Sequence, residues 1–67
     1  MPRYHFVVRE PDNTYDDPDG VHLPNQEAAR DHGHRIVREL REDGYPPGNA
    51  ALIIHDETGQ IVHSITL

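Results

Sequence analysis

A chain of 67 residues is long enough for one small domain and for no more than one. The chain has twelve acidic residues, six arginines and no lysine, so its formal net charge is −6. This charge excludes the concentrated basic surface with which proteins bind the phosphates of nucleic acids. The absence of cysteine excludes disulfides and Cys-type zinc sites and fits a cytoplasmic location, while no apolar run approaches the ~18–20 residues of a membrane span. We therefore expect neither nucleic acid nor a membrane as partner.

The apolar fraction, 34%, is low for a globular domain, where ~45–50% is usual. A domain this small also buries only ~60% of the surface that its unfolded chain exposes. Contact with a protein partner, or with a second copy in a homodimer, would supply part of the missing burial.

The first predicted element is a strand over residues 3–9. Tyr4, Phe6 and Val8 alternate with polar residues, which is the period-two pattern of a half-buried strand. Residues 10–20 are dense in turn formers and are expected to be irregular. Residues 21–23 then predict a short second strand that pairs back on the first.

A helix is predicted over residues 25–43. Asn25 is a good N-cap, because its side-chain oxygen can accept from an otherwise unpaired backbone N–H. Gly44 follows as the expected stop. Apolar or small residues recur at helical spacing on one stripe, at Ala29, Gly33, Ile36, Val37 and Leu40.

Residues 50–55 and 60–66 predict the last two strands, joined by a hairpin loop at 56–59 in which Gly59 can take a positive φ. Two registers stay open. A four-residue loop pairs Ile54 with Ile61, and a three-residue loop with a bulge pairs Ile54 with Val62.

These elements predict one α+β domain over residues 1–67, in the order β-β-α-β-β, with one helix packed on a small, mainly antiparallel sheet. We expect the four strands in the spatial order 2-1-3-4. The most buried side chains are expected to be Phe6, Val8, Ile36, Leu40, Leu52 and Ile54.

Six histidines are the most unusual feature of the composition. His32 and His34, two apart on the helix, point in separate directions, and the metalloprotease motif HEXXH is absent. His5, His55 and His63 share a sheet face only if their strands are neighbours, and a metal site needs ligands within ~2.2 Å of one ion. Scattered histidines on the surface or on a sheet face are the favoured interpretation, so we expect no metal site and no cofactor.

The other candidate chemistry is weaker. The acidic residues of the irregular segment miss the alternating offsets of a calcium loop, which favours a solvated turn; they are Asp12, Asp16, Asp17 and Asp19. Ser64, the single serine, adjoins His63 in a strand, so their side chains point to opposite faces. We therefore expect no catalytic residues and no enzyme.

Four pieces of the chain, taken in order, resemble one known family. They are Met1-Pro-Arg-Tyr-His-Phe, Asp19-Gly-Val-His-Leu-Pro24, Glu27-Ala-Ala-Arg30 and Asp56-Glu-Thr-Gly-Gln-Ile-Val62. The family is a domain of unknown function found in short uncharacterised proteins of rhizobia and other alphaproteobacteria. The resemblance implies a compact α+β domain and brings no activity or functional residues with it. The chain departs from the family at Gly33, inside the helix, and at His63, where an apolar residue is usual.

A looser resemblance is to the HicB-type antitoxin half-domain, which has a strand, an acidic loop, Leu-Pro and a helix with Glu-Ala-Ala. That resemblance implies a protein that sequesters a small basic toxin. From the residues themselves we expect a small non-enzymatic protein-interaction module that binds a protein partner or itself. The alternative is a protein that binds a metal or a small ligand through its histidines.

Overall fold

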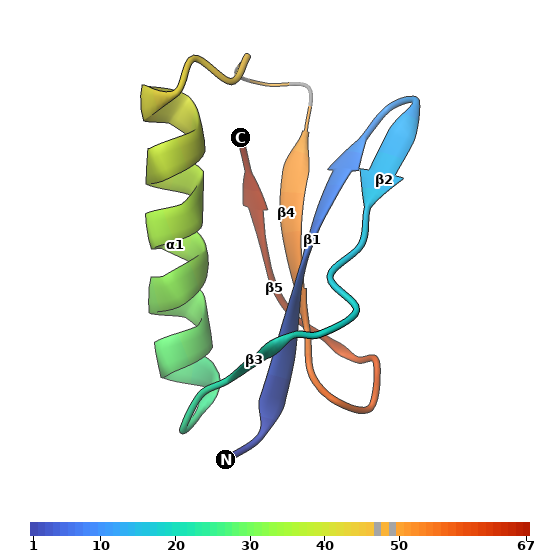
Figure 1. The fold of residues 1–67 in the computed structure, drawn as a ribbon, viewed down its shortest axis with the longest axis vertical. Helices are drawn as coiled ribbons and strands as arrows, with labels where there is room; N and C mark the ends of the chain where they lie inside the picture. The colour runs from blue at the N-terminus through green and yellow to red at the C-terminus, as the bar shows by residue number, and fades with distance from the viewer. Residues whose placement is uncertain (47, 49) are drawn as a thin grey trace.

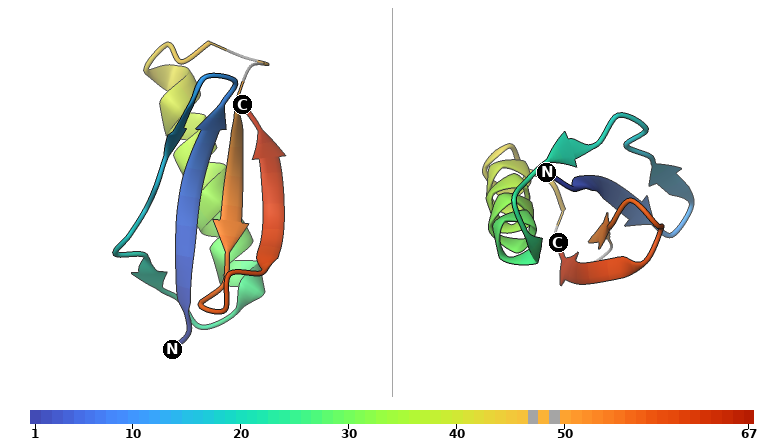
Figure 2. Two further views of the ribbon diagram at one scale, coloured as in Figure 1. Left: turned by 90° about the vertical axis from the view of Figure 1, so that its right-hand side faces the viewer. Right: turned by 90° about the horizontal axis from the view of Figure 1, so that it is seen from below.

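The computed structural model describes residues 1–46, 48 and 50–67. These residues form one helix and a five-stranded antiparallel sheet, an α+β fold as predicted (Figure 1). The helix packs on one face of the sheet, and none of the described residues forms a helix on the opposite face (Figure 2). In chain order the elements are β1 (Arg3–Glu10), β2 (Asn13–Tyr15), β3 (Val21–His22), α1 (Gln26–Glu42), β4 (Ala51–His55) and β5 (Ile61–Thr66).

The strand order confirms the expected arrangement and adds one strand. β4 lies between β1 and β5, while β3 pairs with the start of β1 on its other edge. β2 pairs with the end of β1 on that same edge, with Glu10 opposite Asn13. The prediction that residues 10–20 are irregular was therefore wrong for β2. Its three residues are all exposed and show no apolar alternation, so the pattern of a strand was missing from the sequence.

Both ends of α1 follow from local signals. The side-chain oxygen of Asn25 accepts from the backbone N–H of Ala28 at 2.8 Å, as predicted for the N-cap. At the other end, Gly44 takes a φ of 89° and its N–H donates to the carbonyl of Arg41. The N–H of Tyr45 donates to the carbonyl of Leu40, which completes a Schellman motif.

The core lies between α1 and the inner face of the sheet. Leu52 and Ile54 on β4 are fully buried, and Phe6 is buried opposite Ile54. The prediction was wrong for three of its six residues, because Val8, Ile36 and Leu40 are only partly buried. The remaining buried residues of the cluster are Tyr4, Ala29, Val37, Ala50, Ile65 and Leu67.

The helix face explains two of these errors. Ala29, Gly33 and Val37, spaced four apart, form the row that faces the sheet. Ile36 and Leu40 each precede the next position of that row by one residue, about 100° around the helix, and so lie on its flank. Val8 stands toward the end of β1, where the twisted sheet leans away from α1 (Figure 1).

The β4–β5 hairpin has a register that neither prediction gave. Ile54 pairs with His63, and a bulge then brings His55 opposite Ile61. The longer loop is organised by Asp56, whose carboxylate accepts from the backbone N–H groups of Thr58 and Gln60. Gly59 has a φ of 88°, as expected for this turn. The register places Ile65 opposite Leu52, so that both pack under the helix.

Candidate functional site

The face of the sheet opposite α1, here called the outer face, carries the candidate site. It is turned toward the viewer in the left panel of Figure 2, with the helix behind the strands. Alternation along the strands assigns its residues, apart from Ile61, which the bulge in the hairpin brings opposite His55. They are His5, Val7 and Arg9 on β1, Ala51, Ile53 and His55 on β4, and Ile61, Ser64 and Thr66 on β5.

Two of the histidines considered as metal ligands come together on this face. His5 and His55 are directly opposite each other on β1 and β4. His63 lies on the other face, where its ring is 5.6 Å from that of His34 on the helix. The three histidines therefore do not converge. The reason is the bulge in the hairpin, which places His63 opposite the inward-facing Ile54.

Each histidine of the pair is held by the loop on its own side. His5 Nδ1 lies 2.7 Å from the carbonyl oxygen of Asp17, and His55 Nδ1 lies 3.2 Å from that of Gly59. A carbonyl can only accept, so Nδ1 carries the hydrogen in both rings. Nε2 is then the nitrogen that each neutral ring has available for another group.

The loop before β3 is fixed by Asp17. Its carboxylate accepts from the backbone N–H of Phe6 at 3.1 Å and from that of Gly20 at 3.2 Å. The interpretation of the acidic segment as a solvated turn was therefore wrong for Asp17, which ties the loop to β1. Asp16 is its exposed neighbour and stands at the rim of the outer face.

The hairpin loop forms the opposite side. Hydrogen bonds to Asp56, first that from the Thr58 hydroxyl at 2.7 Å, lower the pKa of this carboxyl. Glu57 beside it is exposed. Of the carboxylates that line the hollow, each loop thus provides one with a structural role and one that is exposed to solvent.

Between the two loops the outer face is hollowed. The hollow has a volume of about 480 Å³ and combines four carboxylates with two imidazoles. Such a lining complements a cationic group, and carboxylates are also the partners that guanidinium groups bind in two-point fashion. Its residues are His5, Val7, Asp16, Asp17, Pro18, His55, Asp56, Glu57 and Gly59.

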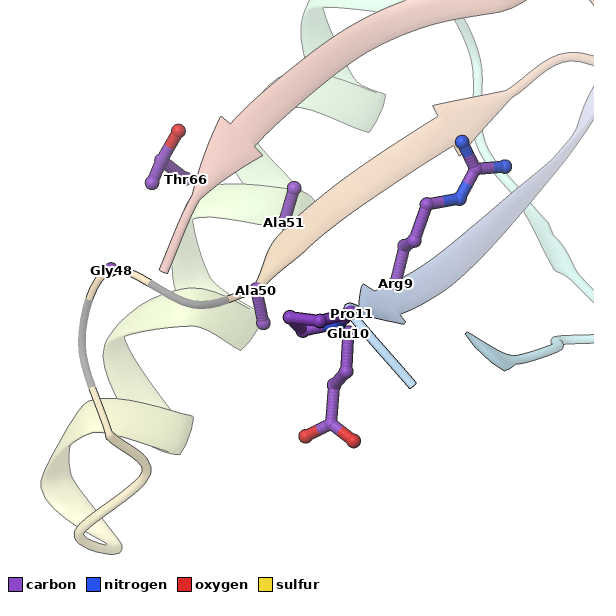
Figure 3. A pocket seen from close by; sticks show the side chains of 7 residues that line it. All are labelled: Arg9, Glu10, Pro11, Gly48, Ala50, Ala51 and Thr66. Carbon is purple, nitrogen blue, oxygen red and sulfur yellow. The ribbon is translucent and has the colours of Figure 1, made fainter. Parts of the chain in front are cut away.

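A second hollow of similar size, about 470 Å³, lies at the other end of the sheet. Figure 3 shows that Arg9 extends along the outer face there, while Ala51 and Thr66 contribute small side chains. Glu10 is engaged by the hydroxyl of Tyr45, and this hydrogen bond to a carboxylate raises the pKa of Tyr45 to about 12. Among the described residues its lining has a single carboxylate, Glu10, so the hollow beside the histidines, with four carboxylates, is the better candidate for binding a cationic group.

The remaining predictions concern catalysis, metals and membranes. Ser64 is on the outer face and His63 on the inner face, as expected from their adjacent positions in β5. Within residues 1–46, 48 and 50–67, no group of three or more His, Cys, Asp or Glu side chains is placed to hold a metal ion. In the same residues, no helix has the length and apolar character needed to cross a membrane.

The sequence contained one usable signal for the candidate site. His5 and His55 both occupy outward positions of predicted strands, so their pairing followed once the two strands were neighbours. The position of Asp16 and Asp17 beside the outer face could not be predicted from the sequence. It depends on contacts between the loop that contains them and β1.

Comparison with known proteins gives one match. A family model described as a domain of unknown function (DUF6894) matches residues 3–67. No curated protein and no solved structure matches the chain. The predicted membership in a family of unknown function is confirmed, and the alphaproteobacterial origin stays a prediction.

Proposed function

We propose that this chain, which belongs to the DUF6894 family of unknown function, is a non-enzymatic module that binds a basic segment of a partner protein. The observation that carries the proposal is the hollow on the outer face, where two loops place four carboxylates around His5 and His55. One partner with such a basic segment is a small basic toxin of the kind that HicB-type antitoxins sequester.

Charge and burial support the proposal. The net charge of −6 attracts a basic segment from a distance and speeds its encounter with the domain. Val7 beneath the hollow gives an apolar floor on which the methylene stem of an arginine or lysine can lie. The carboxylates at the rim then meet the charged head.

The test separates the two exposed carboxylates from the two structural ones. A short arginine-rich peptide is titrated into the full chain by calorimetry at two salt concentrations. We expect binding that weakens as salt screens the charges. The double variant Asp16→Asn with Glu57→Gln should weaken binding by about three- to tenfold, since exposed ion pairs contribute ~0.2–1 kcal/mol each.

The matched control is Asp31→Asn with Glu39→Gln on the exposed side of α1, which changes the net charge equally. Binding to this control should equal that of the unaltered chain at matched salt. Equal losses in both double variants would mean that net charge alone attracts the peptide, and the outer-face site would be wrong.

The second candidate is metal binding by the histidine pair. Metal-bound histidines usually donate their other ring N–H to a carbonyl or carboxylate, as His5 and His55 do at Nδ1. Binding to the native state must raise the melting temperature. Melts with Zn²⁺ or Ni²⁺ should then show a rise that His5→Ala abolishes and His22→Ala retains. No rise at saturating metal would exclude this candidate.

A further inference from the structure

A groove lies between α1 and β5, on the helix side of the sheet and away from the outer face. The two elements contact each other (Figure 1). The groove has a volume of about 370 Å³, and its lining residues are His34, Val37, Arg38, Arg41 and Ile65. Val37 and Ile65 are buried and form an apolar floor, whereas the two arginines and His34 are exposed. Among the described residues, no carboxylate lines this groove.

Helical spacing brings the three polar side chains of the groove together. His34, Arg38 and Arg41 are separated by four and three residues, so they lie on one flank of α1. The other flank of the helix faces β1, since the ring of His32 lies 4.9 Å from that of Phe6. The basic flank therefore faces β5, the strand at the other side of the sheet.

β5 adds a second imidazole next to the groove and fixes one of its arginines. His63 is half-buried, and its ring lies 5.6 Å from that of His34. The guanidinium of Arg41 donates to the carbonyl of Thr66 at 3.0 Å. This hydrogen bond holds the guanidinium beside the groove and uses one of its five N–H donors. Four donors of Arg41 therefore remain for another acceptor.

This gathering of basic groups is unusual for an acidic chain. Acidic residues outnumber arginines two to one, and yet two of the six arginines share a hollow that no described carboxylate lines. A basic residue in the last turn stabilises the helix dipole, which accounts for Arg41. The dipole acts only within that turn, so it does not account for His34, Arg38 or His63. Guanidinium and imidazole groups without a carboxylate complement an anion.

We propose that the groove between α1 and β5 binds a small phosphate ligand. A phosphate group has enough oxygens to accept from both guanidinium groups and an imidazole at once, whereas a carboxylate is satisfied by one guanidinium. A polyanion such as a nucleic acid is disfavoured, because the net charge of −6 repels the phosphates that extend beyond the groove. The groove and the acidic hollow lie on opposite faces of the sheet, so either proposal can fail without the other.

The first test titrates the full chain with inorganic phosphate at pH 7 and constant ionic strength, followed by NMR of the backbone amides. We expect saturable shifts in α1 and β5, with a dissociation constant on the order of 1 mM. Arg38→Gln and Arg41→Gln should each weaken binding about tenfold, because each removes charge-assisted hydrogen bonds. Arg35→Gln, the charge-matched control on the exposed side of α1, should leave binding unchanged.

Melting curves check that each of these variants folds. The absence of saturable shifts in the unaltered chain would overturn the proposal. Equal losses in Arg35→Gln and Arg38→Gln would also overturn it, since phosphate would then respond to the net charge alone.

Glu42 provides a test in the opposite direction. It stands four residues after Arg38, at the spacing at which side chains of opposite charge attract each other on a helix. Such exposed pairs are weak, so a phosphate can displace Glu42 from the arginine. Glu42→Gln should therefore tighten phosphate binding about twofold. Glu39→Gln makes the same charge change on another side of α1, and an equal tightening there would contradict the groove.

Three further probes identify the class of ligand. Acetate should bind at least about tenfold more weakly than inorganic phosphate, because it offers two oxygens and one charge. Phenyl phosphate distinguishes the two sources of a small phosphate ligand. Tighter binding of phenyl phosphate assigns the groove to a phosphate monoester, and equal or weaker binding assigns it to free phosphate. Acetate that binds as well as phosphate, or a short single-stranded oligonucleotide that binds more tightly than either phosphate, would refute the proposal.

Discussion

Gly33 shows at the scale of one residue how helix and sheet are fitted together. Glycine inside a helix costs up to ~1 kcal/mol relative to alanine. A Cβ at this position would lie 2.7 Å from Cδ1 of Ile54 and 3.3 Å from Cδ1 of Ile65. The missing side chain therefore lets α1 approach two buried residues of the sheet, and tight packing offsets the lower helix propensity.

We predict that Gly33→Ala gains none of the ~1 kcal/mol expected at an exposed helical site. Ile54→Val removes the conflicting Cδ1, so the double variant should be more stable than the sum of the single changes by about 1 kcal/mol. Urea denaturation of the four proteins in the cycle measures this coupling. Ile53→Val, on the outer face, is the control and should be additive with Gly33→Ala. Additivity in both cycles would show that Ile54 does not limit the helix–sheet distance.

The spacing of residues placed Gly33 on the buried stripe, and the structure agrees. The reason for a glycine was not predictable, because it lies in side chains of β4 and β5 that are distant along the chain. The same distinction applies to His63. Its position in a strand followed from the pattern, whereas its face depends on the hairpin bulge.

At the scale of elements, α1 was predicted to within one residue at each end, since Asn25 and Gly44 act on their own backbone neighbours. The register of the β4–β5 hairpin was not. It is set jointly by the hydrogen bonds of Asp56 and by the burial of Ile65 opposite Leu52. Local turn residues allow several loop lengths, and the register is fixed only when the Asp56 hydrogen bonds and the packing of the core agree.

Asp56 gives a pH-dependent prediction for this hairpin. Its pKa is lowered in the folded chain, chiefly by the hydrogen bond from Thr58. The ionised Asp56 carboxylate therefore stabilises the folded chain at pH values above its ordinary pKa of 3.8. This contribution to the free energy of unfolding is lost as the pH falls through the lower pKa that Asp56 has in the folded chain. Asp56→Ala should lower the melting temperature at neutral pH and flatten its decline in acid. Glu57→Ala is the control, and an equal effect there would contradict a specific role for Asp56.

The helix face gives a second prediction at this scale. Leu52→Ala should destabilise the domain by ~2–5 kcal/mol, because its fully buried side chain leaves a cavity. Leu40→Ala should cost only about 1 kcal/mol, since Leu40 lies on the flank of α1 and is partly exposed. Urea denaturation measures the free energy of unfolding of both variants, provided that its dependence on urea concentration is the same as in the unaltered chain. A larger loss at Leu40 would mean that α1 is rotated from the orientation described.

For the whole molecule, composition predicted an acidic protein rich in histidine, and the fold shows where these charges gather. Acidic loops meet at one end of the outer face, whereas Arg38 and Arg41 line the groove between α1 and β5. The pairing of His5 with His55 required the strand order, and the loop that carries Asp17 required tertiary contacts. The charge of the chain was thus readable in the sequence, but its distribution over the surface was not.

The net charge leads to the last prediction. The formal charge of −6 at pH 7 falls to zero at the isoelectric point of 5.3, and the chain contains six histidines, the residue type whose ordinary pKa lies between these values. Loss of net charge removes the repulsion that keeps copies apart. We therefore predict a solubility minimum, or increased self-association, between about pH 5 and 5.5.

Light scattering across pH 5 to 8 at fixed salt measures this effect, and two exposed carboxylates provide its control. Asp12→Asn with Asp19→Asn makes the net charge less negative, so the maximum of scattering should move to higher pH. A flat scattering profile would show that the histidines do not control association through net charge.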